Sequence, residues 1–323
     1  LKEYFSSKIT ATYTADADYS YIESVSYYNK KDTLLKILDN IPTDEKVVVF
    51  GDNKERLQEL NRRYPDSAYL SSDNKDTSPV FKQIVQTEHF ECRMLFTTKV
   101  LDNGVNLKDK AIKHIIIEQT DMVEFIQCLG RKRIQDKEDT IKLYFFNNFQ
   151  KIAGLSGVYK SWMQIGQEYF RLKETDHIDE FKNKYRVVSL PIFFDNRSDL
   201  IFPTYYKAKH DYKFCCAVTK KETSLHQQVA IALQKDIAPY EEAEKHYALL
   251  TYLKQNLKKR FFKSDREELI KEFNVRDKYH LQRTIGVLNQ YMIENNIMYE
   301  LQSAQTGRRE GRRTYWVIVP RTV

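Results

Sequence analysis

Three absences narrow the classes of protein to which this sequence belongs. No apolar run approaches the ~20 residues of a membrane-spanning helix, and no signal peptide is visible. The cysteines are few and lack the CxxC spacing of metal sites, and an adjacent pair is poorly suited to a structural disulfide: Cys92, Cys128, Cys215 and Cys216. Reduced cysteines are typical of the cytoplasm. We therefore expect a cytoplasmic protein.

A nucleotide-binding loop is also missing. The chain contains no segment of Gly, any four residues, Gly, Lys and Ser or Thr, and so no such loop is followed by an Asp-Glu pair for magnesium. We expect that the chain alone neither binds ATP tightly nor hydrolyses it. The sequence begins at Leu1 and not at a methionine. We expect it to be the C-terminal part of a longer protein.

Positive charge is concentrated at one end of the chain. The 323 residues have an ordinary globular composition, with 41% hydrophobic and 30% charged residues and a net charge of +7. Residues 246–323 carry 15 Lys and Arg against 8 Asp and Glu, which accounts for the whole surplus. A basic segment of this kind is typical of nucleic-acid contact. The length predicts two or three domains.

The strongest structural pattern lies in residues 22–149, where short apolar runs alternate with helical patterns. Val47–Phe50 reads as a buried strand, after which Gly51 leads into a helix over Lys54–Arg63. Further strands are expected at Ser67–Leu70, up to Phe96, at Ile115–Ile117 and at Ile141–Phe146. Such a series predicts an α/β domain with a parallel sheet and helices on both faces, and with function at the carboxyl ends of the strands.

Two segments of this domain carry candidate functional residues. The first follows the strand at Met94–Phe96 and contains Thr98, then a turn centred on Gly104, then Asn106. Glycine lets backbone approach a phosphate closely. This segment therefore predicts a contact with phosphate or ribose.

The second segment is a helix expected over residues 122–133. Asp121 suits its N-cap, with Glu124 at the capping-box position. Stepping about 100° per residue places Phe125, Ile126 and Leu129 within about 60° of Met122, towards the sheet. Gln127 and Arg131 then lie on the free face. A guanidinium is a permanent charge with fixed geometry, suited to a phosphoryl group.

The order of Thr98, Gly104 and Asn106, then Gln127, Gly130 and Arg131, resembles motifs V and VI of superfamily 2 nucleic-acid helicases. The segment around Gly51 resembles motif IV. The resemblance covers the second RecA-like motor domain. It implies that Arg131 stabilises a transferring phosphoryl, that Gln127 positions water or phosphate, that Asn106, Gly104 and Gly130 lie at the nucleotide, and that Thr98 and Gly51 touch nucleic acid. ATP and Mg²⁺ would be held mainly by a first RecA-like domain outside this chain.

The sequence departs from the family pattern at the second arginine of motif VI. The family has it three residues after the first, where this chain has Ile134, and Arg133 sits one position early. If the helix runs on, Arg133 lies about 200° from Arg131, towards the apolar face. We therefore expect Arg131 to be the arginine finger, with Arg133 serving only if the helix ends near Gly130.

The remainder divides into three parts. Residues 1–21 are a linker or a remnant of a first motor domain. Residues 150–245 predict a mixed, largely helical accessory region, including a strand pair over 187–202 and a helix over 158–172 whose aromatic side chains are interpreted as core, with base stacking as the alternative. Residues 246–323 predict a winged-helix-like α+β domain, with helices over 247–261, 266–273 (Ser264 as N-cap) and 278–294, and a hairpin. Its expected nucleic-acid contacts are Arg283 on the third helix and Arg308, Arg309, Arg312 and Arg313 at the hairpin tip.

Three interpretations remain open. The leading one is the C-terminal portion of an ATP-dependent superfamily 2 helicase or translocase acting on DNA, with RNA not excluded. A restriction or defence translocase subunit shares the same motifs. The third is a non-enzymatic winged-helix DNA-binding protein whose RecA-like domain is a scaffold. In that case Gly104 is a plain turn and Arg131 a solvated helix residue.

Overall fold

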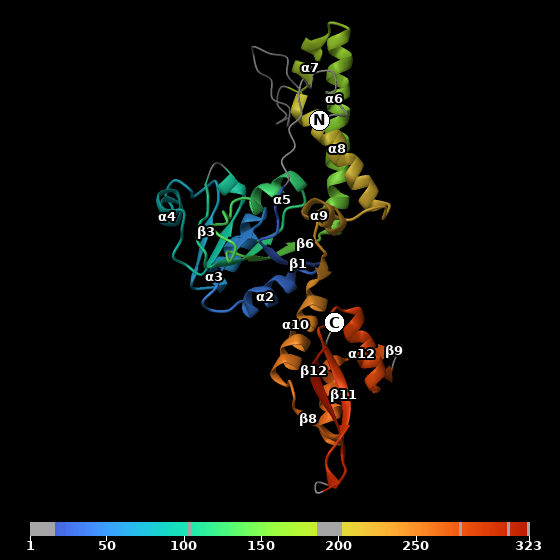
Figure 1. Cartoon of the computed structure of the whole chain (residues 1–323). Helices are drawn as coiled ribbons and strands as arrows, with labels where there is room; N and C mark the ends of the chain where they lie inside the picture. The colour runs from blue at the N-terminus through green and yellow to red at the C-terminus, as the bar shows by residue number, and fades with distance from the viewer. Residues whose placement is uncertain (1–16, 103–104, 186–201, 278–279, 309–310, 322–323) are drawn as a thin grey trace. The chain divides into compact units, whose positions relative to one another are not determined.

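The computed structural model describes residues 17–102, 105–185, 202–277, 280–308 and 311–321 (Figure 1). The chain divides into two compact units, Leu1–Ala238 and Pro239–Val323, each with its own buried apolar cluster. The second unit thus begins before residue 246. Gly104, Arg309 and residues 187–201 of the expected strand pair lie outside the described residues. Among the residues that are described, no helix is both long and apolar enough to cross a membrane.

The first unit is built on a seven-stranded sheet with the order β3-β4-β2-β5-β6-β1-β7. The pairs from β3 to β1 are all parallel, which confirms the predicted sheet. Its strands are β1 (Ile22–Tyr28), β2 (Lys46–Phe50), β3 (Ser67–Leu70), β4 (Met94–Thr97), β5 (Ile112–Ile117), β6 (Ile141–Phe146) and the short β7 (Ala238–Pro239).

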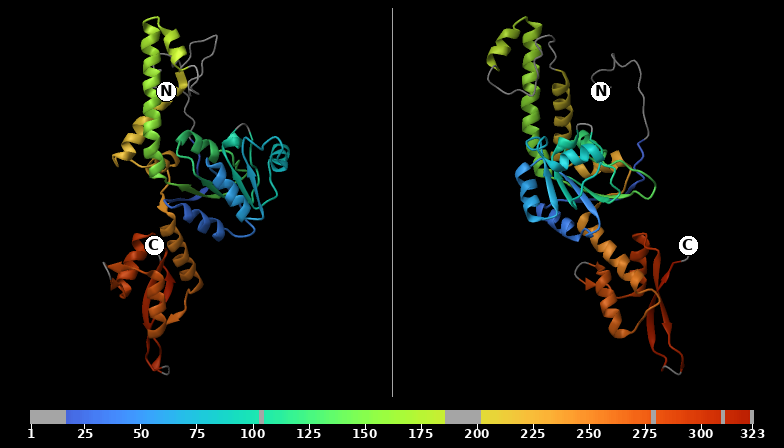
Figure 2. Two further views of the ribbon diagram at one scale, coloured as in Figure 1. Left: turned by 180° about the vertical axis from the view of Figure 1, so that it is seen from behind. Right: turned by 90° about the vertical axis from the view of Figure 1, so that its left-hand side faces the viewer.

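Helices cover both faces of this sheet. α2 (Lys31–Asn40) and α3 (Lys54–Arg63) lie on one face, and α4 (Pro79–Thr87) and α5 (Met122–Leu129) lie on the other (Figures 1 and 2). The central strands are buried on both sides, so β2 has four consecutive buried residues, Val47–Phe50. Local caps fix the helix starts: the Asn53 side chain accepts from Arg56 N at 2.9 Å at the start of α3. This is the RecA-like α/β fold.

A pair of long helices leaves the sheet after β6. α6 (Phe149–Glu174) packs along α8 (Phe202–Thr219), with α7 (Ile178–Lys184) beside them, and α9 (Leu225–Leu233) returns to the sheet (Figures 1 and 2). The two long helices approach closely at Gly166, where an added Cβ would lie 2.3 Å from the Tyr205 ring. Tyr169, Leu172 and Phe181 form a small separate core there. The predicted helix over 158–172 is the C-terminal part of the longer helix α6.

The second unit has the order of elements of a winged helix. α10 (Tyr240–Gln255), β8 (Arg260–Phe261), α11 (Lys263–Phe273), α12 (Ile285–Glu294), β11 (Tyr299–Gln305) and β12 (Thr314–Pro320) follow in turn, with a short pair, β9 (Arg276–Asp277) and β10 (His280–Leu281), before α12. The antiparallel sheet has the order β11-β12-β8. This confirms the predicted winged-helix-like domain.

The predicted helix boundaries in this unit were wrong at four places. α10 begins at Tyr240 and not at 247. α10 ends at Gln255, because residues 260–261 pair with Trp316 and Val317 of β12. α11 begins at Lys263 with Phe262 as N-cap, since the Phe262 N–H bonds Asp265 Oδ2 at 3.1 Å, so Ser264 lies inside the helix. α12 begins at Ile285 and not at 278, because His280 and Leu281 pair with Asp277 and Arg276 as β10 and β9.

Candidate nucleotide and nucleic-acid sites

Motif VI begins on α5, whose start is fixed by its cap. The Asp121 carboxylate accepts from the backbone N–H groups of Val123 at 2.8 Å and Glu124 at 3.1 Å. Phe125, Cys128 and Leu129 are buried against the sheet, and Gln127 is exposed, as predicted. The helix ends at Leu129 with Gly130 as C-cap. The expectation that it continues to residue 133 was wrong.

A strand-like pairing takes over after Gly130. Leu107 N–H donates to the Arg131 carbonyl at 2.8 Å, and Arg133 N–H donates to the Leu107 carbonyl at 2.8 Å. Lys132 and Leu107 thereby form a parallel bridge. Successive side chains of an extended segment point to opposite sides. Lys132 therefore points inward, and Arg131 and Arg133 share the outer side.

This geometry corrects the expected position of Arg133. Its Nε donates to Asn106 Oδ1 at 2.8 Å. Arg131 Nη1 donates to the Val105 carbonyl at 3.4 Å, and its Nε to the Gln127 carbonyl at 3.2 Å. Both guanidinium groups thus reach the segment that follows the motif V turn, and Arg133 does not turn towards the apolar face.

Asn106 links this arginine pair to a second loop. Its Nδ2 donates to Glu88 Oε1 at 3.4 Å, while its Oδ1 accepts from Arg133. Glu88 has a left-handed backbone, with φ of 60°, and pairs with Lys108 at 2.6 Å. The bond from Lys108 lowers the pKa of Glu88. Two guanidinium groups and one amide side chain therefore lie within one polar cluster, formed by Asn106, Arg131 and Arg133, and Gln127 contacts it through its backbone carbonyl.

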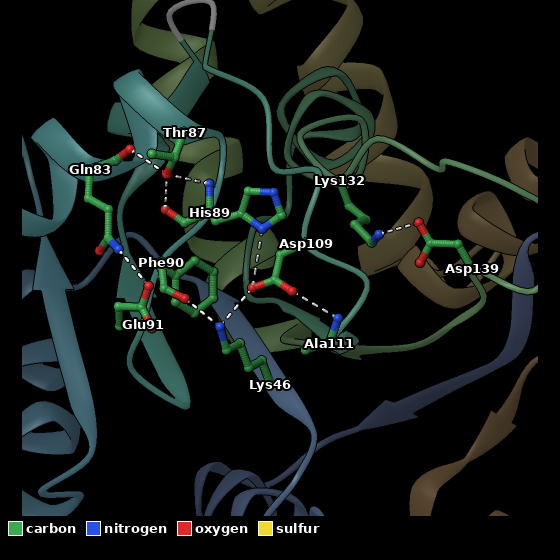
Figure 3. Close-up of polar contacts among 10 residues, drawn as sticks. All are labelled: Lys46, Gln83, Thr87, His89, Phe90, Glu91, Asp109, Ala111, Lys132 and Asp139. Carbon is green, nitrogen blue, oxygen red and sulfur yellow. Dashed lines mark hydrogen bonds and ion pairs between the residues drawn. The ribbon is translucent and has the colours of Figure 1, made fainter.

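Below this cluster lies a buried ion pair. Lys132 Nζ contacts Asp139 Oδ2 at 2.6 Å, and both side chains are 0% exposed (Figure 3). Burial lowers the pKa of Lys132, although the bond to Asp139 opposes this shift. The Gln135 N–H also donates to Asp139 Oδ2. The pair fixes the inward side of the 131–133 segment and so the outward direction of both arginines.

A second lysine–aspartate pair holds the loops that precede β5. Lys46 Nζ bonds Asp109 Oδ2 at 2.7 Å and also bonds the Phe90 carbonyl, and His89 Nδ1 lies 3.8 Å from Asp109 (Figure 3). Burial raises the pKa of Asp109, but the bonds from Lys46 and Ala111 N–H outweigh it and lower the pKa overall. These contacts join the loops after α4 and before β5, between which Asn106 is held.

A second candidate site is a cleft of about 700 Å³ where strands β2, β4 and β5 end. Gly51 and Thr98, both predicted to touch nucleic acid, line it together. Gly51 N–H donates to the Thr97 carbonyl at 2.9 Å, and an added Cβ would lie 3.0 Å from Leu57. Five lysines also line this cleft: Lys54, Lys75, Lys99, Lys151 and Lys207.

Four of these lysines are held by carboxylates. Lys54 pairs with Asp73 at 2.7 Å, Lys99 with Glu124 at 2.9 Å, and Lys151 with Asp52. Lys207 bonds Asp121 and, at 2.6 Å, Asp211. Burial lowers the pKa of Lys207, but these two carboxylates raise it overall. The cleft thus holds an ordered array of lysines, of which Lys99, Lys151 and Lys207 are paired with carboxylates that also line it.

Sequence reasoning missed the aromatic wall of this cleft. Tyr159 and Trp162 of α6 line it, with ring centroids 5.7 Å apart at 80°. Burial raises the pKa of Tyr159 to about 12. Both were interpreted as core, with base stacking as the alternative; Tyr159 does pack against the main core as well as lining the cleft, and Tyr169 is buried. Their spacing from Lys151 and Leu155 was the available signal, because these four residues share one helical face.

The structure gives the positions of four of the five arginines that are predicted to contact nucleic acid from the winged unit. Arg283 lies before α12 and pairs with Glu267 at 2.8 Å. The expectation that it lies on the third helix was therefore wrong. Arg308, Arg312 and Arg313 are exposed at the hairpin tip, and the Arg313 guanidinium lies 5.7 Å from the Phe262 ring centroid. Within α12, all of which is described, the exposed side carries no Lys or Arg: Gly286, Val287, Gln290, Ile293 and Glu294.

Comparison with known proteins finds similarity in structure alone. The chain matches no protein-family profile and no curated protein sequence. Among solved structures it is similar to the E. coli DEAD-box protein SrmB bound to the regulator of ribonuclease activity A, with 15% identity, 40% of this chain and 79% of that chain covered, and a TM-score of 0.30.

Two further solved structures have comparable similarity. The yeast DEAD-box splicing factor Prp28 has 16% identity and a TM-score of 0.33, with 54% of this chain and 39% of that chain covered. The Mycobacterium smegmatis helicase Lhr bound to single-stranded DNA and AMP-PNP has 15% identity and a TM-score of 0.30, with 42% and 21% covered. The chain therefore spans well under half of these two proteins.

Proposed function

We propose that this chain is the second motor half and nucleic-acid-binding tail of an ATP-dependent superfamily 2 helicase or translocase. The observation that carries the proposal is the pairing of residues 105–107 with 131–133. It brings Asn106 of motif V into a 2.8 Å hydrogen bond with Arg133 of motif VI, beside Arg131. Residues that carry the family resemblance, far apart in sequence, thus form one cationic cluster.

The proposed chemistry is transfer of the terminal phosphoryl of ATP to water. Arg131 and Arg133 would neutralise charge that develops on that phosphoryl, and Gln127 would orient the water or a phosphate oxygen. Asn106 would contact the ribose or couple the two sites. The triphosphate and Mg²⁺ would be held mainly by a first RecA-like domain. Gly51 and Thr98 would contact the phosphates of the nucleic-acid strand.

The first test is the activity of the chain alone. We expect ATP turnover at background, with or without nucleic acid, because the sequence contains no segment of Gly, any four residues, Gly, Lys and Ser or Thr, which would cradle the phosphates. The measurement is phosphate release in a preparation free of other ATPases. A nucleic-acid-stimulated turnover of about 1 per second, as is ordinary for phosphoryl-transfer enzymes, would contradict the proposed division of labour between two motor domains.

The hairpin tip of the winged unit is the second part of the proposal. Replacing Arg308, Arg309, Arg312 and Arg313 together by alanine should weaken binding to duplex DNA and flatten its salt dependence. Each phosphate neutralised contributes roughly 0.9 to the slope of log affinity against log salt, so the slope should fall by up to about 3 to 4. Sequence preference should hardly change, because arginines on phosphates do not read bases.

The measurement is fluorescence anisotropy of labelled duplex at several salt concentrations. Lys254→Ala on the exposed side of α10 is a matched control, since it removes a cation of the same unit outside the hairpin. The control should keep nearly the whole slope. A slope in the quadruple variant equal to that of the unaltered chain would remove the hairpin from the nucleic-acid interface.

A further inference from the structure

We propose that the cleft at the ends of β2, β4 and β5 binds single-stranded nucleic acid, with a base stacked on the Trp162 and Tyr159 pair of α6. This inference rests on the proposed function and adds to it an aromatic contact outside the motifs. The observation behind it is that α6 presents a cation and two aromatic rings along one face of a cleft that already contains Gly51 and Thr98.

The order of the side chains along one face of α6 suits a bound nucleotide. Lys151, Leu155, Tyr159 and Trp162 follow one another at steps of four, four and three residues and all line the cleft. The helix begins at Phe149, directly after β6, and its N-cap Asn148 accepts from Lys151 N–H at 3.0 Å. The cation therefore lies near the strand ends, and the aromatic rings lie farther along the helix.

The aromatic pair is ordered but still accessible. Trp162 and Tyr159 are each partly exposed, and the edge-to-face contact at 5.7 Å fixes one ring against the other. By contrast, Tyr169 of the same helix is 1% exposed and belongs to a core. A flat, partly exposed ring beside ordered cations is the arrangement that sequence-tolerant single-strand binders use, because every base has a stacking face.

The size of the cleft and its aromatic rings favour a strand over a duplex. Its volume of about 700 Å³ falls in the range of sites that enclose small ligands, the size class of single nucleotides. In a duplex the faces of the bases are covered by their neighbours, so a ring can reach them only on a single strand. The cations would meet the phosphates between stacked bases.

The existing ion pairs do not prevent phosphate binding. The side chains of Lys54 and Asp73 are 43% and 66% exposed, and those of Lys99 and Glu124 are 65% and 30% exposed. Exposed pairs contribute about 1 kcal/mol or less, so a phosphate can replace the carboxylate at small cost. Lys207 is held by two less exposed carboxylates, Asp121 and Asp211, and is expected to keep its partners.

Tryptophan fluorescence tests the proposal at the site itself. The chain has two tryptophans, so Trp316→Phe leaves Trp162 as the only one. Titrating this variant of the full chain with oligo(dT), oligo(rU) and a duplex of equal length should quench Trp162 with the two single strands and not with the duplex. The two single-stranded arms separate DNA from RNA. If Trp316→Phe disturbs folding, the difference between titrations of the unaltered chain and of Trp162→Phe reports the same ring.

Affinity gives a second, independent readout. Base stacking on an aromatic side chain contributes about 1–3 kcal/mol per base, so Trp162→Ala should weaken single-strand binding by roughly 5- to 150-fold. Trp162→Phe should restore most of the affinity, because phenylalanine also stacks. Val158→Ala is the matched control, since Val158 is 42% exposed on the same helix and does not line the cleft. It should bind like the unaltered chain.

The outcomes separate this inference from the proposed function. If anisotropy detects single-strand binding but Trp162 fluorescence and Trp162→Ala affinity do not change, the cleft inference is wrong and the proposed function stands. If the duplex quenches Trp162 as strongly as the single strands, the preference for a single strand is wrong. If no nucleic acid of any kind binds the chain, the proposed function fails as well.

Discussion

Replacing Arg133 by alanine in a protein that carries both motor domains should lower ATP turnover by about 1000-fold, and replacing Arg131 should cause a loss of similar size. Arginine fingers contribute roughly 10³-fold or more to phosphoryl transfer. We expect losses of similar size because α5 ends at Leu129 and both guanidinium groups reach residues 105–106. The measurement is steady-state ATP hydrolysis at saturating ATP and nucleic acid.

Lys137→Ala is the control for these two variants, since Lys137 is an exposed cation in the following loop. Its turnover should match that of the unaltered protein. Retention of nearly full turnover in Arg133→Ala, together with a large loss in Arg131→Ala, would show that Arg133 only positions Asn106. In that case Arg131 alone is the finger, as the helical extrapolation from sequence predicts.

The second large effect concerns the buried pair under these arginines. Replacing Lys132 by alanine should lower the free energy of unfolding of the first unit by about 3–5 kcal/mol, because it leaves the Asp139 carboxylate buried without its cation. Asp139→Ala should be as costly for the converse reason. The measurement is urea unfolding followed by Trp162 fluorescence in the Trp316→Phe chain, so that the first unit alone is reported.

A double replacement provides the control for this prediction. Lys132→Met with Asp139→Leu removes both charges and restores apolar contacts, which is often neutral or stabilising for a buried pair. It should recover most of the stability that either single change loses. A loss below about 1 kcal/mol in both single variants would mean that water reaches the pair. The pair would then not be what directs the two arginines outward.

Local pattern was enough to predict the sheet of the first unit and the start of α5. The strands are short apolar runs that are buried on both faces, as in β2, and the Asp121 cap marks a helix start unambiguously. The end of α5 was not predictable in the same way. Gly130 and the residues after it are compatible with a continuing helix, and the helix stops because residues 131–133 pair with residues 105–107 and bury Lys132. That competition is long-range in the sequence.

The role of the aromatic residues in the cleft and the start of α12 also could not be predicted from local sequence pattern. Tyr159 and Tyr169 have the same periodicity on one helix, yet one lines a cleft and the other a core, because different elements pack against each end of α6. Residues 278–284 continue the apolar spacing of α12, but the pairing of β10 with β9 takes His280 and Leu281 out of the helix. Periodicity identifies an apolar face and does not identify what covers it.

The most direct test of the proposed motor function is a side-by-side measurement of nucleic-acid-stimulated ATP turnover. It compares this chain with the protein translated from the reading frame extended upstream of Leu1. The proposal predicts an upstream phosphate-cradling Gly-Lys loop, background turnover for the chain alone, and stimulated turnover for the extended protein that Arg133→Ala abolishes. An extended protein without such a loop, or with turnover that is indifferent to both Arg131→Ala and Arg133→Ala, would contradict it.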